Sequence, residues 1–215
     1  MAAVALISVG VFLFMAKTVF IDQNNTLDTT AFAFAESHKT DAFTRFMEFT
    51  TFFASRDFLI IGSIGLALFF MFIKKHRWYS VKVPVIAAGS SLLNQGMKLL
   101  FDRPRPASAF YEQPGFSFPS GHAMIGGAFY GLLIYLVWTN IQNKLLRWVL
   151  VLLLSIWVLL IGYSRVYLHV HYASDVLAGW SAGFIFLIIC LVLLRLLEPK
   201  YARKAHNVME ENQTT

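Results

Sequence analysis

The sequence predicts an all-α, polytopic membrane protein with six transmembrane helices, on the basis of its composition, its long apolar segments and the placement of its basic residues. Of the 215 residues, 57% are hydrophobic and only 14% are charged, and the mean hydropathy is +0.60. A typical soluble domain carries about 25% charged residues. The composition therefore excludes an ordinary soluble globular protein and favours a chain that lies mostly in a lipid bilayer.

Six apolar segments are candidates for membrane-spanning helices, because crossing the hydrocarbon core takes roughly 20 residues, with a range of about 17 to 25. The second and fifth are short, so their helices are expected to extend into the flanking loops. An uncleaved first helix is favoured over a signal peptide, because no basic region precedes it and its apolar run is too long. The six segments are residues 2–21, 57–73, 82–101, 121–138, 147–163 and 175–195.

Three short polar stretches lie at the ends of these segments and carry most of the reactive side chains. Cations, histidines and carboxylates are costly to bury beside membrane-spanning helices, so such a cluster indicates a functional site. The stretches are Lys98 to Arg105-Pro106, then Phe118 to His122, and then Ser164-Arg165 followed by His171 and Asp175.

Five of these residues predict a phosphate-binding site. Lys98, Arg105 and Arg165 bind anions, and the planar fork of arginine matches the oxygens of a phosphate. Ser120 is expected to cap the helix that begins at Gly121, whose free backbone N–H groups and dipole would also hold phosphate. A glycine at this point lets the backbone approach the ligand closely.

Three further residues predict nucleophilic catalysis. His171 and Asp175 are four residues apart, which on a helix places both side chains on one face. The carboxylate would hold one ring nitrogen of His171 and leave the other free as a nucleophile. His122 is the second histidine of the cluster, and it would protonate the leaving oxygen and later activate water.

A metal site made of His122, His169, His171 and Asp175 is an alternative interpretation, since histidine and carboxylate are common ligands. The three cations of the same cluster would repel a metal ion, so neither a metal nor a cofactor is predicted. His169 is expected to be structural, because it points away from His171 in any regular element. Arg103 stays open between a phosphate contact and a plain helix end at Arg103-Pro104.

In order, type and spacing, the three stretches resemble the tripartite signature of the type 2 phosphatidic acid phosphatase superfamily. That family contains integral-membrane lipid phosphatases, glucose-6-phosphatase and vanadium haloperoxidases, and the apolar composition disfavours the soluble haloperoxidase branch. The resemblance implies metal-independent hydrolysis of a phosphomonoester or diphosphate through a phosphohistidine intermediate. It implies His171 as nucleophile, Asp175 as its orienting group and His122 as acid, with the phosphate held by Lys98, Arg105, Ser120, Gly121 and Arg165.

The basic residues predict the orientation of the chain, because loops rich in lysine and arginine stay on the cytoplasmic side. Both termini are then cytoplasmic, and all three motifs lie at the extracytoplasmic ends of the helices. The net charge of +6 fits attraction to anionic lipid head groups and gives no indication of nucleic acid binding. The ten residues are Lys74, Lys75, Arg77, Lys82, Lys144, Arg147, Arg195, Lys200, Arg203 and Lys204.

The chain is expected to form one domain over residues 1–205, followed by a polar tail over residues 206–215. Its longest stretch between spans, residues 22–56, carries apolar residues at helical spacing between positions 43 and 54. This pattern predicts an amphipathic helix. Two placements stay open: in the outer membrane interface as a lid near a lipid entrance, or packed against the bundle.

Two functions of different classes follow from these features. The first is a lipid phosphatase of the cell membrane, expected in a bacterial inner membrane, acting on undecaprenyl diphosphate, phosphatidylglycerophosphate, phosphatidic acid or the phosphates of lipid A. The alternative is a non-hydrolytic protein on the same scaffold that binds or transports phospholipids. The complete set of His122, His171 and Asp175 favours the enzyme, while the sequence specifies neither the substrate nor the oligomeric state.

Overall fold

The structure is a computed structural model that describes residues 2–73 and 76–198, and these residues contain eight α-helices and no strand. The expected all-α class is therefore confirmed. The predicted polar tail, residues 206–215, lies outside the described residues. The helices are α1 (Ala2–Phe20), α2 (Thr26–Ser37), α3 (Asp41–Phe52), α4 (Arg56–Phe72), α5 (Tyr79–Phe101), α6 (Gly121–Asn140), α7 (Lys144–Tyr167) and α8 (Ala173–Leu196).

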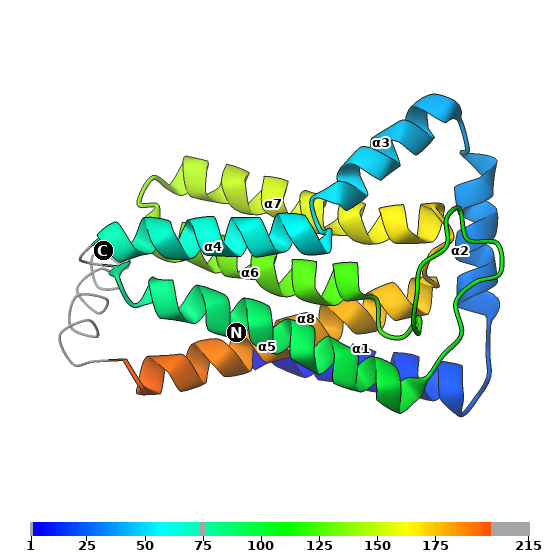
Figure 1. Ribbon diagram of the computed structural model, residues 1–215, viewed down its shortest axis with the longest axis horizontal. Helices are drawn as coiled ribbons and strands as arrows, with labels where there is room; N and C mark the ends of the chain where they lie inside the picture. Colours follow the sequence, from blue (N-terminus) through cyan, green and yellow to red (C-terminus); the bar gives the residue numbers. More distant parts are fainter. Residues whose placement is uncertain (1, 74–75, 199–215) are drawn as a thin grey trace.

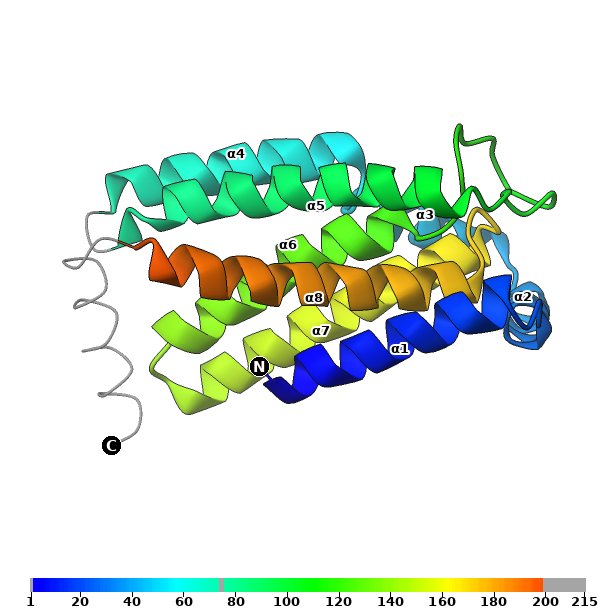
Figure 2. The same cartoon turned by 90° about the horizontal axis from the view of Figure 1, so that it is seen from below.

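Six of these helices, α1 and α4 to α8, run side by side along the long axis of the molecule (Figure 1). The two short helices α2 and α3 gather at one end of this bundle, together with the loop of residues 102–120 that joins α5 to α6. A second view, turned by 90°, shows the same arrangement, with α1 lying along α8 (Figure 2). The bundle thus has one end covered by α2, α3 and a long loop, and an opposite end where short connections join the helices.

Each of the six predicted membrane segments coincides with one of the long helices. By length and apolar composition alone, four of them qualify as membrane spans, namely α1, α6, α7 and α8. A fifth span results if α3 and α4, which are bent by 44° at their junction, are counted as one. Helix α5 has 23 residues, but Lys82, Asn94 and Lys98 interrupt its apolar sequence. The chain is therefore an integral membrane protein with four to five clear candidate spans, rather than six of equal apolarity.

Polar caps and backbone turns set the limits of the helices. Thr40, Ser55 and Asn143 accept hydrogen bonds from backbone N–H groups in the first turns of α3, α4 and α7, at 3.2, 3.3 and 3.0 Å. Helix α5 ends at Asp102, which has a left-handed φ of 39°, and α7 ends before His169, with a φ of 54°. Both of these sharp ends occur where the polar motifs begin or continue.

Glycines bring α8 into close contact with its neighbours, as expected for helices packed in a membrane. A Cβ atom added at Gly183 would lie 2.3 Å from the backbone oxygen of Met124 in α6. A Cβ at Gly179 would lie 2.8 Å from the backbone oxygen of Ser120, just ahead of α6. In α7, a Cβ at Gly162 would overlap the indole ring of Trp180. Helix α8 is thus fixed against α6 by backbone contacts, and against α7 by the Trp180 ring, at positions where only glycine leaves room.

The region between the first and second spans holds two helices, where the sequence predicted one. The expected amphipathic helix corresponds to α3, which packs against α7 through a Thr44–Tyr167 hydrogen bond of 2.9 Å between their hydroxyls. Its residues Met47 and Thr50 are fully buried. This packing supports the second of the two placements considered for that helix. Helix α2 was missed, because its alternating alanine and phenylalanine residues lack a clear helical stripe.

The α6–α8 contact predicts a large effect of one methyl group on stability. Replacing Gly183 with alanine should lower the free energy of unfolding by about 1–3 kcal/mol, because the new Cβ meets a backbone oxygen that cannot move away. Thermal unfolding in detergent micelles would measure this loss. Gly10→Ala in α1 is the matched control, since a Cβ there meets nothing within 4 Å. A Gly183→Ala variant as stable as Gly10→Ala would contradict the described packing.

Candidate functional site

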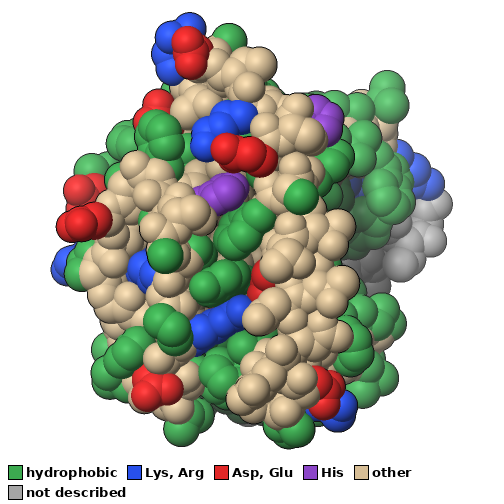
Figure 3. Space-filling model, turned by 90° about the vertical axis from the view of Figure 1, so that its right-hand side faces the viewer, with side chains coloured by type: hydrophobic (Ala, Val, Ile, Leu, Met, Phe, Trp, Pro, Cys, Tyr) green, Lys and Arg blue, Asp and Glu red, His purple; other side chains and the backbone are tan. Residues whose placement is uncertain are grey.

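The three polar motifs meet at the end of the bundle that α2 and α3 cover. Lys98 lies in the last turn of α5, Arg105 in the following loop, and His122 in the first turn of α6. Arg165 lies in the last turn of α7, and His171 in the turn that leads into α8. Seen end-on, this face shows lysine, arginine and histidine side chains among apolar ones (Figure 3). The structure thus brings together residues that are more than 70 positions apart.

His171 and Asp175 are in contact, although not through the helical stacking that their spacing suggested. His171 precedes α8, because the left-handed turn at His169 ends α7 and the new helix starts only at Ala173. The Nδ1 atom of His171 lies 3.4 Å from Oδ2 of Asp175. That same oxygen accepts a hydrogen bond from the backbone N–H of Tyr172 at 3.0 Å. Asp175 therefore orients the ring from the N-terminus of the next helix.

The other nitrogen of the His171 ring faces a cation. Its Nε2 atom lies 3.2 Å from Nη1 of Arg105, and since arginine only donates, Nε2 is the acceptor and Nδ1 carries the proton. Burial lowers the pKa of His171 to about 3, because removal from water disfavours the charged ring more than contact with Asp175 favours it. The ring is therefore neutral near pH 7, with Nε2 bearing the lone pair that a nucleophile needs.

Three cations lie near His171 and Asp175 and have no carboxylate partners of their own. Among the described residues, Lys98, Arg105 and Arg165 form no ion pair. Lys98 donates to the backbone oxygen of Phe116, and Arg105 donates to the backbone oxygens of Gly115 and Val170 at 3.0 and 2.9 Å. Neutral oxygens satisfy their geometry but leave their charge uncompensated, so the arrangement favours an anionic ligand.

Arg165 is completely buried and is held by side chains that sequence analysis did not identify. Its Nη1 donates to the hydroxyls of Thr51 at 2.5 Å and Tyr111 at 2.7 Å. Its Nη2 donates to Oε1 of Gln113 at 2.9 Å, and the same oxygen accepts from Nη1 of Arg105 at 3.1 Å. An amide oxygen thus lies between two guanidinium groups, where an anionic phosphoryl oxygen would bind more strongly.

The start of α6 supplies the remaining predicted residues. Ser120 is the N-cap residue, but its buried Oγ has no hydrogen-bond partner among the described residues and its side chain does not cap the helix. Its backbone N–H donates to the backbone oxygen of Asp175 at 3.0 Å. A Cβ at Gly121 would lie 3.1 Å from Oδ1 of Asn94. His122 lies close enough to Arg165, His171, Arg105 and Lys98 to interact with them electrostatically. An unpaired hydroxyl and a second histidine thus border the cations.

The alternative metal site finds no support in the arrangement of donors. Within residues 2–73 and 76–198, no three His, Cys, Asp or Glu side chains converge on one point. His169 turns away from His171, as expected: its Nδ1 lies 2.9 Å from the hydroxyl of Ser108 and its ring stacks on Phe32 at 4.4 Å. His169 therefore belongs to the packing of α2 against the loop.

Sequence reasoning missed several contacts of the site. Ser117 donates to Oδ2 of Asp175 and lies 3.3 Å from Nδ1 of His171, so it bridges the pair. Arg103, which was left open, does not join the unpaired cations, because it is paired with Asp28 and Asp175. Serine and glutamine next to a motif give no pattern that distinguishes them from loop residues. Only the folded chain reveals these partners.

Comparison with known proteins agrees with the fold and with the motifs. A phosphatidylglycerophosphatase B of Bacillus subtilis is 30% identical over 131 residues, which make up 59% of this chain and 62% of that protein. The Escherichia coli protein YbjG, provisionally named an undecaprenyl-diphosphatase, is 29% identical over 143 residues, or 62% of this chain and 66% of that one. The matched region thus spans slightly less than two thirds of each curated relative.

Two crystal structures share the fold. A transmembrane PAP2-type phosphatidylglycerolphosphate phosphatase from Bacillus subtilis superposes with a TM-score of 0.81 at 22% identity, covering 91% of this chain and 98% of the other. LpxE of Aquifex aeolicus superposes with a TM-score of 0.63 at 23% identity, covering 79% and 97%. The pattern of the PAP2 superfamily matches residues 79–198, more than half of the chain and all three motifs. This chain therefore belongs to the PAP2 superfamily.

Proposed function

We propose that this protein is an integral-membrane lipid phosphatase that hydrolyses a phosphomonoester or diphosphate through a phosphohistidine intermediate. The observation that carries the proposal is the neutral His171 ring, oriented by Asp175 on one side and facing unpaired cations on the other. The names of the two relatives make phosphatidylglycerophosphate and undecaprenyl diphosphate the leading substrates. Phosphatidic acid and the phosphates of lipid A carry the same reacting group.

In the first step, the Nε2 lone pair of His171 attacks phosphorus and the bond from phosphorus to the lipid oxygen breaks. His122 enters this step as the doubly protonated cation next to the anionic phosphate, and it gives a proton to the leaving oxygen, so the lipid departs as a neutral alcohol or as a monophosphate. His171 becomes a cationic phosphoimidazole whose Nδ1–H faces Asp175, 3.4 Å away. The carboxylate stabilises this charge as it forms.

In the second step, a water molecule attacks the phosphorus atom from the side that the lipid has left. His122, now neutral, takes a proton from this water, and the bond between phosphorus and Nε2 of His171 breaks. Inorganic phosphate leaves, and both histidines return to their starting states. Lys98, Arg105 and Arg165 stabilise the charge on the phosphoryl oxygens in each transition state, which is the main requirement of phosphoryl transfer.

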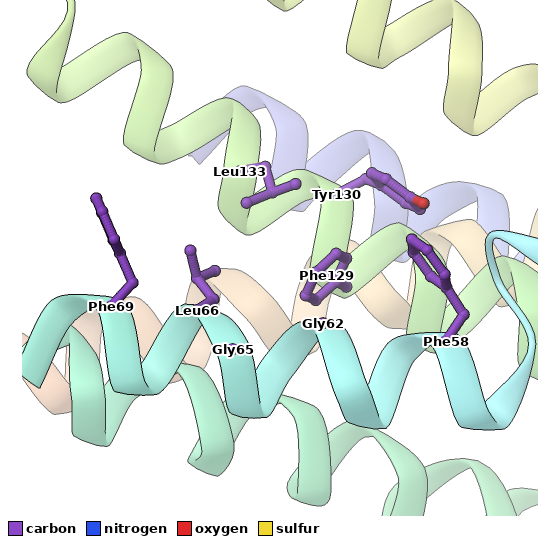
Figure 4. A pocket seen from close by; sticks show the side chains of 8 residues that line it. All are labelled: Phe58, Gly62, Gly65, Leu66, Phe69, Phe129, Tyr130 and Leu133. Carbon is purple, nitrogen blue, oxygen red and sulfur yellow. The ribbon is translucent and has the colours of Figure 1, made fainter.

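An apolar groove between α4 and α6 supports a substrate with a lipid tail. It has a volume of about 450 Å³, and Phe58, Leu66 and Phe69 of α4 project beside Phe129 of α6 (Figure 4). Its outer end adjoins Phe53, whose backbone oxygen accepts a hydrogen bond from Tyr130 at 2.8 Å. Thr51, which contacts Arg165, lies two residues earlier. An acyl or prenyl chain in this groove would lie next to a phosphate group bound at the site.

The same proposal includes six membrane-crossing helices, with the site away from the cytoplasm. Basic residues at the opposite end of the bundle support this orientation, because such residues remain on the cytoplasmic side. They are found at the start of α7 (Lys144 and Arg147), near the start of α5 (Arg77 and Lys82) and at the end of α8 (Arg195). The remaining basic residues of this set lie outside the described residues. The expected location is a bacterial inner membrane.

Removal of the nucleophile tests the function directly. His171→Ala should reduce phosphate release from the preferred lipid by about 10⁴-fold or more, because no covalent intermediate can form. Purified protein in detergent would be assayed on phosphatidylglycerophosphate, undecaprenyl diphosphate, phosphatidic acid and glucose 6-phosphate. His38→Ala, which alters an exposed histidine of α2's C-terminal end, is the matched control.

The outcomes of this assay separate the two classes of function. Activity retained by His171→Ala would exclude the phosphohistidine mechanism. No release by the wild type from any lipid phosphate would favour the non-hydrolytic alternative, which lipid-transport assays would then test. EDTA should leave the wild-type rate unchanged, whereas vanadate, which mimics five-coordinate phosphorus, should inhibit. Loss of activity with EDTA that zinc or magnesium restores would contradict metal-independent catalysis.

The protonation state of His171 can be measured without a substrate. The ring should remain neutral from pH 7 down to pH 5, because burial lowers its pKa to about 3 and an imidazole is charged only below its pKa. Nitrogen NMR of ¹⁵N-histidine-labelled protein would show this, with the His171 signal assigned by its loss in His171→Ala. A His171 signal that titrates between pH 6 and 7 would contradict the buried, neutral nucleophile.

The groove predicts a dependence on tail length. Gly65→Leu should raise KM for a long-chain lipid phosphate by roughly 3- to 10-fold, since a Cβ at Gly65 meets nothing within 4 Å and the side chain would fill the groove. KM for a short-chain analogue should change little. Gly10→Leu, at an equally open position of α1, serves as the control. Equal effects on both tail lengths would place the tail elsewhere.

A further inference from the structure

Arg103 differs from the other cations of the site because it is already neutralised. Its side chain is 8% exposed and lies between two carboxylates, with Nη2 2.8 Å from Oδ2 of Asp28 and Nη1 2.6 Å from Oδ1 of Asp175. Nη1 also donates to the hydroxyl of Ser174 at 2.8 Å, and the guanidinium group stacks over the Tyr172 ring at 3.9 Å. With its charge and donors occupied in this way, Arg103 is not placed to bind phosphate.

Asp28 reaches this cluster from α2, far outside the residues that the family pattern matches. It is 2% exposed. Its Oδ1 accepts the backbone N–H of Ser174 at 2.8 Å, and its Oδ2 accepts the Ser174 hydroxyl at 2.8 Å. Ser174 lies in the first turn of α8, where backbone N–H groups have no partner within the helix. Asp28 therefore binds both Arg103 and the start of the helix that carries Asp175.

Arg103 and His171 contact different oxygens of the Asp175 carboxylate. Arg103 holds Oδ1, so Oδ2 is the oxygen that faces Nδ1 of His171. A guanidinium fork can bridge two carboxylates in this way, whereas a lysine ammonium group lacks the planar spread of donors. Loss of the fork would leave Oδ1 without this partner, so the carboxylate would be held through Oδ2 alone.

The net charge of Asp28, Arg103 and Asp175 also suits a reaction in which His171 becomes positively charged. Asp28 and Asp175 carry two negative charges and Arg103 one positive charge, so one negative charge remains next to His171. The phosphorylated His171 ring would carry the balancing positive charge. Replacing Asp28 with a neutral residue would make the remaining pair neutral overall, and the charge on His171 would lose part of its stabilisation.

We infer that Arg103 and Asp28 are positioning residues that fix Asp175, and through it His171, for attack on the phosphoryl group. This inference rests on the proposed function. Neither residue touches the substrate in this assignment. Helix α2 is then part of the catalytic structure, because its Asp28 sets the orientation and the charge of the residue that holds the nucleophile.

Kinetics of three variants and one control test the inference. Asp28→Asn keeps the shape of the side chain, and both it and Arg103→Lys should lower kcat by roughly 10²-fold, because small displacements of catalytic groups have effects of this size. KM should stay within about threefold, since phosphate is bound by other residues. Asp22→Asn is the matched control, as it removes the charge of an aspartate in an exposed ion pair with Lys17. Asp28→Glu, which restores the charge, should recover part of kcat.

Chemical rescue separates positioning from folding. Arg103→Ala should lose activity. Added guanidinium ion should raise the kcat of this variant at least tenfold, because the ion can enter the space between the two carboxylates. The same ion should not restore His171→Ala. A melting temperature measured alongside would show whether the variant protein is folded, and absence of rescue in folded Arg103→Ala would overturn the inference. A change in KM alone would overturn it as well, because Arg103 would then bind the substrate.

The proposed function and this inference can fail independently. A wild-type protein without activity on any lipid phosphate would overturn the function. An active wild type whose Asp28→Asn and Arg103→Lys variants match Asp22→Asn would overturn only the positioning role. Nitrogen NMR measures positioning without turnover: the Nδ1–H signal of His171, which faces Asp175, should shift in Asp28→Asn and stay unchanged in Asp22→Asn. An unchanged Nδ1–H signal in Asp28→Asn would count against the inference.

Discussion

The hydrogen bonds of Asp175 hold the functional end of the molecule together. Its side chain accepts from Arg103, Ser117 and the backbone N–H of Tyr172, and it lies against His171. Its backbone oxygen accepts from the N–H of Ser120, which starts α6. One residue thus links the loop of residues 102–120, the start of α6, the turn after α7 and α8. A fully buried carboxylate persists only when its charge is compensated, so these segments must assemble together.

The cations of the site fall into two groups that differ in whether their hydrogen-bond acceptors are charged or neutral. Arg103 lies between two carboxylates of the protein, whereas Arg105 and Arg165 donate only to neutral acceptors in the described structure. Positive charge without a carboxylate partner is costly in a buried place and is retained where an anion binds. Binding of phosphate would therefore stabilise this end of the bundle. Residue type alone cannot make this distinction, since all three are arginines in or beside the polar motifs.

Much of the fold and the central site was predictable from the sequence, for physical reasons. Six long apolar segments leave little alternative to helices, and the cations, histidines and carboxylate at their ends predict the phosphate chemistry that is proposed for the site. The errors occurred where local spacing misleads or says nothing. The left-handed turn at His169 puts His171 ahead of α8, so a four-residue spacing to Asp175 did not mean a shared helix face. The pairing of Asp28 with Arg103 joins residues 75 positions apart, and no periodicity in the sequence predicts such a contact.

Packing within the membrane and chemistry at its edge are coupled through α8. Gly179 lets α8 approach the backbone oxygen of Ser120, and one turn earlier Asp175 accepts the Ser120 N–H. The spacing of α6 and α8 therefore sets the position of the unpaired Ser120 hydroxyl relative to His171. The proposed phosphate-binding residues Lys98, Gly121 and Arg165 lie in the helices of the bundle, whereas Arg105 and Ser120 lie in the loop of residues 102–120. Under the proposed function, the segments that surround these helices would distinguish lipid head groups, while the phosphoryl chemistry stays the same.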